Sequence, residues 1–128
     1  MISVHARGLG ASRILVHLVQ VVPPGEVTAV INTADDLILH GLHISPDLDT
    51  VTYTLAGLHD TETGWGLANE TWKAMEALET LGGPSWFRLG DRDLGTHLYR
   101  TSRLAEGASL AAVTAEIASS FGLEIRLL

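Results

Sequence analysis

The sequence lacks cysteine altogether, and Lys and Arg make up only 8 of its 128 residues. A chain without cysteine has neither a disulfide framework nor a thiolate metal site. The basic residues are scattered and the formal net charge is −7, whereas nucleic-acid binding needs clustered Lys and Arg against the phosphates. We therefore expect no nucleic-acid partner.

Long apolar runs are absent as well. No stretch approaches the roughly 20 consecutive apolar residues that span a bilayer. Residues 1–13 lack the order of basic, apolar and small residues that is typical of a secretory signal peptide. We therefore expect a cytoplasmic protein without a membrane partner.

The hydrophobic residues that are present, 46% of the chain, are arranged as alternating strands and helices. Strand-like runs at 2–6, 27–32 and 123–128 are separated by helical spacing at 14–19, 45–58, 69–81, 91–106 and 109–121. Asn69 and Ser109 are the expected N-caps of the helices that they begin. Strands that alternate with helices indicate a parallel sheet. We predict a Rossmann-like α/β layered fold with a mainly parallel sheet, in a single domain over residues 1–128. Because the last strand is apolar and ends the sequence, we expect this fold to be truncated.

Four acidic side chains follow the second predicted strand. Asp35 and Asp36 come directly after it, and Asp47 and Asp49 lie in the first turn of the next predicted helix. Oxygen ligands of this type suit Mg²⁺. The helix dipole also favours acids at a helix start, so helix capping with solvated loop charges is the competing interpretation. The spacing alone does not decide between the two.

Three further segments carry residues suited to ligand binding. Gly8 and Gly10 precede a helix, where bare backbone and free N–H groups can bind phosphate, although an ordinary tight turn explains the glycines equally well. Asp91 is the expected N-cap of its helix, and Arg92 is either a phosphate clamp or the ion-pair partner of an adjacent acid. Trp65, between two glycines, could stack on a flat ring or plug the core.

The histidines and the known catalytic motifs indicate no further site. His40 and His43 lie near the acidic doublet, but their spacing fixes no geometry. His97 is interpreted as structural, since a lone histidine usually is. The sequence contains neither a Gly-x-Ser-x-Gly nucleophile elbow nor a Walker phosphate loop.

Taken together, these segments resemble the CofD family of 2-phospho-L-lactate transferases over nearly the whole chain, from about Val22 onward. The Asp-rich and Gly-Asp-Arg-Asp segments in combination are highly specific. The matching motifs, in order, are Asn32-Thr33-Ala34-Asp35-Asp36, Gly41-Leu42-His43, Ser45-Pro46-Asp47-Leu48-Asp49-Thr50, Tyr53-Thr54-Leu55-Ala56-Gly57, Gly64-Trp65-Gly66-Leu67, Glu70-Thr71-Trp72, and Leu89-Gly90-Asp91-Arg92-Asp93-Leu94 with Thr96-His97.

The resemblance implies the N-terminal portion of a transferase of coenzyme F-420 biosynthesis. A lactyl or enolpyruvyl diphosphoguanosine would donate a 2-phospholactyl or phosphoenolpyruvyl group to the deazaflavin FO and release GMP, with Mg²⁺ as cofactor and a homodimer as the full-length assembly. On this basis the candidate metal ligands are Asp35, Asp47 and Asp49. The candidate catalytic residues are Asp35, Asp36 and Asp49. The candidates for nucleotide and FO binding are Gly8, Gly10, Arg13, Tyr53, Trp65, Asp91 and Arg92.

Two positions depart from the family pattern. The family opens with Gly-Gly-x-Gly-Gly, whereas Arg7 stands here at the first glycine and Ala11 at the last. A Cβ at either place hinders a close approach of the backbone to phosphate. Two alternatives therefore stay open: a catalytically inactive nucleotide-binding fragment, and a nucleotide-sugar-binding regulator of the related gluconeogenesis-factor type.

Overall fold

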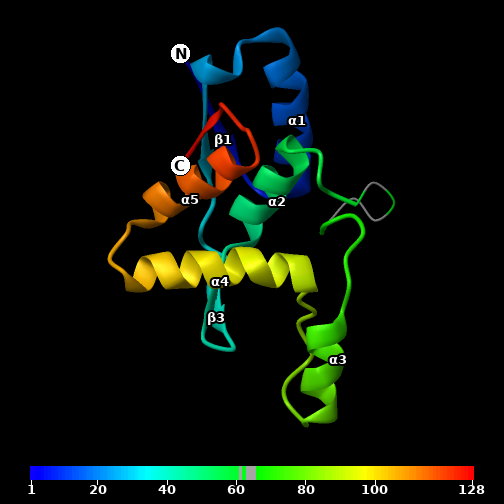
Figure 1. The fold of residues 1–128 in the computed structure, drawn as a ribbon. Coiled ribbons are helices and arrows are strands. Elements are labelled where there is room, and N and C mark those ends of the chain that lie inside the picture. Colours follow the sequence, from blue (N-terminus) through cyan, green and yellow to red (C-terminus); the bar gives the residue numbers. More distant parts are fainter. Residues whose placement is uncertain (61, 63–65) are drawn as a thin grey trace.

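A three-stranded parallel sheet lies at the centre of the upper half of the molecule in Figure 1. The computed structural model describes residues 1–60, 62 and 66–128. β1 (Ile2–Ala6), β2 (Val27–Ile31) and β5 (Arg126–Leu127) lie in the order β1-β2-β5, and both neighbouring pairs are parallel. β2 lies in the middle because its apolar and β-branched residues tolerate burial on both faces. This arrangement confirms the predicted α/β fold class.

Three helices complete the core around the sheet. α1 (Gly8–Val21), α2 (Pro46–Leu55) and α5 (Leu110–Ser120) contribute Leu15, Val51 and Ala118 to one apolar cluster with the strands. Leu15 and Val51 are fully buried, and burial of a side chain of this size contributes about 1.5–3 kcal/mol. We call this apolar cluster of strands and helices the sheet cluster. The short 3-10 helix η1 (Pro24–Glu26) leads into β2.

A second apolar cluster lies below the sheet, among β3 (Leu37–Leu39), β4 (Leu42–Ile44), α3 (Lys73–Thr80) and α4 (Asp91–Ala105). Its buried residues are Ile44, Met75 and Leu89. In Figure 1, α4 crosses beneath the sheet, and α3 extends away from one end of α4. We call this group the lower cluster. The chain therefore has two packing centres, and the polar residues described below lie between them.

The hairpin of β3 and β4 was not predicted from the sequence. The two strands pair antiparallel from Leu37 opposite Ile44 to Leu39 opposite Leu42. His40 and Gly41 connect them with φ of 53° and 74°, the left-handed conformations of a two-residue hairpin turn. The pattern of two short apolar runs around a glycine was present in the sequence, but each run has only three residues.

α2 ends at Leu55, three residues before the predicted end at 58, because a glycine closes it. Gly57 takes φ 72°, and its N–H donates to the carbonyl of Thr54 (3.2 Å). The N–H of Leu58 reaches back to the carbonyl of Tyr53 (2.9 Å). This pair of hydrogen bonds is a Schellman motif, which satisfies the last free carbonyl groups of the helix.

Two other predicted boundaries were wrong. α1 begins at Gly8, well before residue 14, and the Ser12 hydroxyl donates to the carbonyl of Gly8 (3.1 Å) in its first turn. β5 covers only Arg126–Leu127 of the predicted 123–128, because Gly122 (φ 75°) and the turn around it separate the strand from α5. In contrast, Ser109 caps α5 as predicted, accepting a hydrogen bond from the N–H of Ala112 (3.1 Å).

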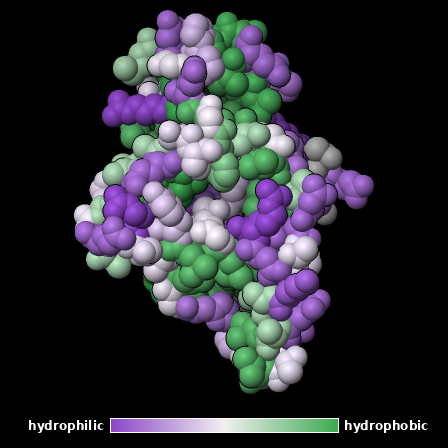
Figure 2. All heavy atoms as spheres, in the orientation of Figure 1, coloured by the Kyte–Doolittle hydropathy of each residue, from purple (hydrophilic) through white to green (hydrophobic). Residues whose placement is uncertain are grey.

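Figure 2 shows apolar side chains over the region of α4 and at the end of the molecule where α3 lies, with hydrophilic side chains on both flanks. Leu98 on α4 and Leu81 after α3 are among the exposed large apolar residues. Among the described residues, no helix combines the length and the apolar character that crossing a membrane requires.

Candidate functional site

A pocket of about 280 Å³ opens between α2, α4 and the chain that precedes α4. We call it the α2–α4 pocket. Its apolar and aromatic lining includes Ile44, Leu67, Trp72 and Phe87. Its polar lining includes Asp49, Tyr53, Glu70, Arg88, Asp93 and His97. An apolar cavity with a few convergent polar groups is the usual form of a small-molecule site.

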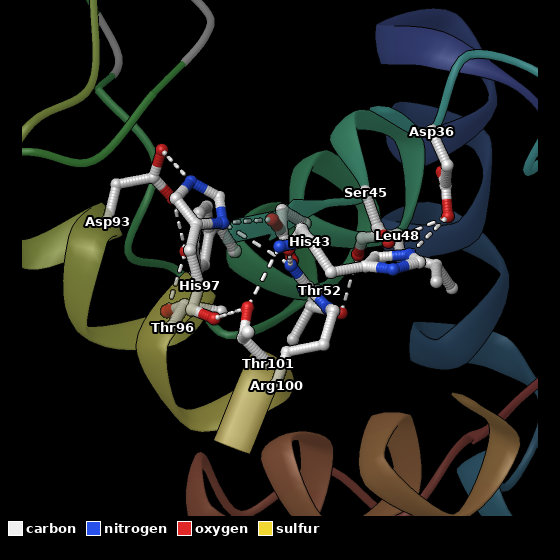
Figure 3. Close-up of polar contacts among 12 residues, drawn as sticks. Asp36, His43, Ser45, Leu48, Thr52, Asp93, Thr96, His97, Arg100 and Thr101 are labelled. Atoms are coloured by element: carbon white, nitrogen blue, oxygen red, sulfur yellow. Dashed lines mark hydrogen bonds and ion pairs between the residues drawn. The ribbon is translucent and has the colours of Figure 1, made fainter. Parts of the chain in front are cut away.

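The imidazole of His97 lies between two carboxylates of this pocket, and Figure 3 shows it beside Asp93. Its Nε2 is 3.0 Å from Oδ2 of Asp93, and its Nδ1 is 3.6 Å from Oδ2 of Asp49. Asp93 and His97 are four residues apart on α4 and therefore share one face of that helix, whereas Asp49 comes from α2. His97 is only 1% exposed, so this cluster ties the two helices together in the interior.

Arg100 completes the cluster on the side away from Asp93. It is 1% exposed, and its guanidinium contacts a carboxylate oxygen of Asp49. It also donates to the carbonyl of His43 (3.1 Å) and lies 3.3 Å from Nδ1 of His97. Since a guanidinium only donates hydrogen bonds, Nδ1 is the acceptor of that contact, and the proton of a neutral His97 lies on Nε2, facing Asp93.

Burial and charge set the protonation of these groups. Burial raises the pKa of Asp49 to about 6, an effect that Arg100 opposes and the charge of Asp93 reinforces. Burial also acts to raise the pKa of Asp93, but the hydrogen bond and charge of His97 and the hydrogen bond from Tyr53 outweigh it and lower that pKa. Burial, and then the charges of Asp49 and Asp93, raise the pKa of Tyr53. At neutral pH the pocket therefore presents an ionised Asp93 and a neutral Tyr53 hydroxyl.

The acids predicted after β2 lie in a different place, at the carboxyl ends of β1 and β2. Asn32, directly after β2, donates to Asp47 (2.8 Å) and to Asp35 (3.4 Å). Arg7, directly after β1, forms an exposed ion pair with Asp35 (3.5 Å). We call Arg7, Asn32, Asp35 and Asp47 the acidic edge. Ligands of open α/β sheets bind at this edge of the sheet.

Asp36 belongs to neither group. It accepts a hydrogen bond from the Ser45 hydroxyl (2.7 Å), and Nε2 of His43 lies 3.3 Å from the same oxygen (Figure 3). Ser45 stands at the N-cap position of α2, but its hydroxyl is used for Asp36 and not for the helix. The four predicted acids are thus divided among three environments. Asp35 and Asp47 share Asn32, Asp36 anchors the start of α2, and Asp49 joins His97 and Arg100.

Among the described residues, one group has its ligand atoms close enough to share a metal ion: Asp49, Asp93 and His97, within 4.8 Å of one another. Oδ2 of Asp49 is buried without a hydrogen-bond partner, which suits a cation, but Arg100 already neutralises that carboxylate. Two carboxylates and an imidazole suit Mn²⁺ or Zn²⁺ as well as Mg²⁺. The predicted ligand set of Asp35, Asp47 and Asp49 stays a prediction.

The predicted phosphate-binding residues lie at the start of α1. Gly8 takes φ 67°, and a Cβ at Gly8 or Gly10 would meet no other atom within 4 Å. Arg13 is exposed on the same helix. A shallow hollow of about 270 Å³ adjoins the acidic edge and is lined partly by His5, Arg7 and Asn32. The free N–H groups of α1 and this hollow therefore lie at the same end of the sheet.

The other predicted binding residues are distributed as follows. Tyr53 lines the α2–α4 pocket; its hydroxyl donates to Asp93 (2.6 Å) and lies 2.8 Å from that of Thr96. Arg92 donates to the carbonyl of Ala68 (2.7 Å) and pairs with no adjacent acid. Trp65 lies outside the described residues.

Asp91 does not cap its own helix, which was the prediction; Gly90 occupies that N-cap position. The carboxylate of Asp91 instead accepts hydrogen bonds from the N–H groups of Lys73 and Ala74 at the start of α3, both at 3.0 Å. Asn69, expected to cap α3, takes φ 56° and lies before the helix begins.

The sequence interpretation missed two polar residues that form this site, one in the pocket lining and one behind it. His97 was assigned a structural role, and Arg100 was not considered a site residue. One sequence feature indicates them: Asp93, His97 and Arg100 recur at intervals of four and three residues, and hence on one face of a helix. The partner on α2, Asp49, could not be assigned to them without the fold.

Known proteins similar to this chain agree with the resemblance noted above. The family model described as 2-phospho-L-lactate transferase CofD matches residues 2–128. A phosphoenolpyruvate transferase of Nocardia farcinica is 47% identical over 122 residues, covering 94% of this chain and 37% of the relative. One of Streptomyces griseus is 46% identical over 128 residues, covering 99% of this chain and 40% of the relative. One of Mycobacterium avium is 50% identical over 104 residues, covering 80% and 31%.

The chain thus spans about two fifths or less of the length of these relatives. The family match nevertheless covers all but the first residue and includes both the acidic edge and the α2–α4 pocket. This chain belongs to the CofD family of 2-phospho-L-lactate transferases.

Proposed function

We propose that the chain carries the donor and acceptor sites of a transferase in coenzyme F-420 biosynthesis. The reaction moves a phosphoenolpyruvyl or 2-phospholactyl group from a guanosine-diphosphate-linked donor to a hydroxyl of the deazaflavin FO, with release of GMP. The observation that carries the proposal is the α2–α4 pocket, whose lining combines aromatic side chains with the carboxylate of Asp93. Support comes from the names of the relatives, which are phosphoenolpyruvate transferases.

The two ends of the site suit the two substrates. The start of α1 and the hollow beside the acidic edge suit the diphosphate, because helix N–H groups bind anions. The α2–α4 pocket suits the flat ring of FO, because Trp72 and Phe87 offer aromatic faces and edges. Arg88, which lies 4.8 Å from the ring of Trp72, adds a positive charge at the same wall.

The residues of the pocket can orient the acceptor. The ionised carboxylate of Asp93 can accept a hydrogen bond from the attacking hydroxyl of FO, and Tyr53 and His97 hold that carboxylate in place. The hydroxyl oxygen bonds to the phosphorus next to the three-carbon group, the bond from phosphorus to the GMP oxygen breaks, and Asp93 takes the hydroxyl proton. Positioning of the two substrates is the main contribution of the protein in transfers of this type.

Mg²⁺ is proposed as the cofactor, with Asp35 and Asp47 at the acidic edge as its protein ligands. Their shared neighbour Asn32 holds both carboxylates on one side of the sheet edge. When bound, the ion neutralises the diphosphate charge and so favours departure of GMP. Asp49 is less suited to this role than predicted, because Arg100 pairs with it. A cytoplasmic location and a homodimeric full-length enzyme belong to the same proposal.

A second candidate function, nucleotide binding without catalysis, is favoured by Arg7. It stands where the family has a glycine and forms an ion pair with Asp35 (3.5 Å), one of the proposed magnesium ligands. A cation already beside this carboxylate competes with a metal ion. Both partners are largely exposed, so the pair is weak and substrate can displace it.

The experiment that separates these functions is a mass-spectrometric assay with FO, the enolpyruvyl or lactyl diphosphoguanosine donor, and Mg²⁺. The proposal predicts FO that carries the phosphoenolpyruvyl or 2-phospholactyl group, together with GMP, and EDTA should abolish the formation of both. GDP binding by folded protein without any product would establish the binding function instead. Arg7→Gly serves as a matched variant, since restoring the family's glycine should raise Mg²⁺ affinity if the ion pair competes with the metal.

A further inference from the structure

Two acidic side chains beside the α2–α4 pocket cap helix starts across from them: Glu70, in the chain before α3, caps α4, and Asp91, in the first turn of α4, caps α3. The first turn of α4 has no side chain of its own at the N-cap, because that residue is Gly90. The carboxylate of Glu70, twenty residues earlier in the chain, accepts hydrogen bonds from the N–H groups of Arg92 (2.8 Å) and Asp93 (3.1 Å) instead. These N–H groups have no partner within their own helix.

Asp91, in the first turn of α4, makes the reciprocal contacts. Its two carboxylate oxygens accept from the N–H groups of Lys73 and Ala74 at the start of α3, and one also accepts from the Thr71 hydroxyl (2.6 Å). A hydrogen bond from the N–H of Asp91 to the carbonyl of Thr71 (2.9 Å) joins the two backbones directly. The starts of α3 and α4 are therefore held together by an exchange of caps.

The glycine at position 90 is explained by this exchange. Gly90 is buried, and a Cβ placed there would collide with the side chain of Glu70. Its φ of −70° is open to any residue, so backbone conformation does not require a glycine here. The requirement is space for the Glu70 carboxylate.

We propose that Glu70 is a positioning residue, which places the Asp93 carboxylate in the α2–α4 pocket by fixing the first turn of α4. The backbone N–H of Asp93 donates a hydrogen bond to Glu70, while the side chain of Asp93 accepts one from Tyr53 and faces His97. A shift of the first turn therefore moves the carboxylate directly. The proposed function gives this position its role in orienting the acceptor hydroxyl, and in that respect the inference rests on it.

The matched pair of variants is Glu70→Ala and Asp91→Ala, since each removes one of the two exchanged caps and only Glu70 bonds the backbone of Asp93. The main readout is the NMR signal of the His97 Nε2–H, which donates to Asp93, together with hydrogen exchange of the helix-start amides. Glu70→Ala should broaden the His97 signal and speed exchange at Arg92 and Asp93 by about 100-fold. Asp91→Ala should speed exchange at Lys73 and Ala74 and leave the His97 signal sharp.

Turnover supplies the functional readout. Glu70→Ala should lower kcat by about 10- to 100-fold, the size expected when a reacting group is misplaced by about 1 Å, with a smaller change in KM. Asp91→Ala should lower kcat far less. A wild-type chain without turnover would refute the proposed function and leave the NMR result standing. A sharp His97 signal in folded Glu70→Ala would overturn the positioning role even if turnover is present.

A double-mutant cycle tests the same contact through stability. Gly90→Ala should lower the unfolding midpoint strongly in the wild-type background, because the new methyl group collides with Glu70. In the Glu70→Ala background the space is empty, so at least half of that loss should disappear. Equal losses in both backgrounds would show that Glu70 does not occupy this space, and would overturn the inference.

Discussion

At the scale of single residues, the buried guanidinium of Arg100 links three parts of the chain. It contacts Asp49 on α2, the carbonyl of His43 on β4, and His97 on its own helix. No lysine could make all three contacts, because an ammonium group lacks the flat fork of donors. The α2–α4 pocket therefore depends on a residue that lies behind its lining.

We predict that Arg100→Met lowers the free energy of unfolding by about 3–5 kcal/mol at pH 7.5, the usual cost of leaving one partner of a buried ion pair alone. Urea unfolding measures this loss. Arg103→Met is the control on the same helix, because Arg103 pairs with Glu106 and Glu116 at the surface, and it should change stability far less. Similar losses for the two variants would contradict the assigned role of Arg100.

The protonation of Asp49 gives a second prediction at this scale. Its pKa is about 6 in the folded chain and 3.8 without the fold, so between these values the folded chain holds a proton that the unfolded chain releases. Stability from this group is therefore greatest below about pH 4 and falls as pH rises through 6. Relative to Asp49→Asn, which does not titrate, the wild type should lose about 2 kcal/mol between pH 4 and pH 7.5.

Urea unfolding of both proteins at the two pH values, in metal-free buffer, measures this difference. The absolute stabilities of wild type and variant can differ for other reasons, so only the change of their difference with pH is informative. A difference that stays constant, or that grows in favour of the wild type, would mean that the Arg100 guanidinium outweighs the burial of Asp49.

At the scale of secondary-structure elements, glycines that look alike in the sequence have different roles. Gly41 takes φ 74° in the β3–β4 turn, whereas Gly10 lies inside α1 in an ordinary helical conformation. We predict that Gly41→Ala lowers the free energy of unfolding by about 1–2 kcal/mol, the cost of a left-handed conformation for a residue with a Cβ. Gly10→Ala should stabilise slightly, since alanine is the better helix former.

Binding of GDP separates stability from function at these same positions. If the start of α1 receives the diphosphate, Gly10→Ala should weaken GDP binding by about tenfold or more although the protein is as stable as the wild type, because a new Cβ keeps phosphate away from the backbone. Gly41→Ala should bind GDP as the wild type does. Calorimetric titration with GDP and Mg²⁺ distinguishes the two, and unchanged binding by Gly10→Ala would place the diphosphate elsewhere.

The secondary-structure elements also show how much of the fold the sequence alone could predict. Strand β2 and helix α5 were predicted well, because β-branched runs and a serine cap are local features. The β3–β4 hairpin was missed because its strands are very short. The cap of α3 was assigned to Asn69, whereas Asp91 supplies it from eighteen residues away. Contacts of this range follow from the tertiary fold, which a local pattern cannot specify.

The same limit applies to the candidate site. The family resemblance implied one metal centre of Asp35, Asp47 and Asp49, but α2 directs Asp47 to the acidic edge and Asp49 to the α2–α4 pocket. Residues two apart on a helix do not share a face, so this division was foreseeable once α2 was assigned. The pairing of Asp49 with Arg100 was not, because it joins residues fifty-one positions apart.

At the scale of the whole molecule, the described chain combines the sheet cluster and the lower cluster through polar contacts. The sheet cluster draws on β1, β2, β5, α1, α2 and α5, whereas the lower cluster has only three fully enclosed apolar residues. Asp49, His97 and Arg100 lie at the junction of the two. The proposed acceptor pocket is therefore built where a well-packed part of the molecule meets a lightly packed one.

This difference predicts two levels of stability within one chain. Because local opening costs least where few apolar contacts are lost, the amides of α3 should exchange with a free energy at least about 2 kcal/mol below that of the β2 amides. Native-state hydrogen exchange in low concentrations of urea measures both. Met75→Ala should lower the opening free energy of α3 selectively, while Leu15→Ala, in the sheet cluster, should lower that of β2 by about 2–5 kcal/mol. If α3 and β2 exchanged with equal free energies, the two clusters would form one cooperative unit, and the lower cluster would not open on its own.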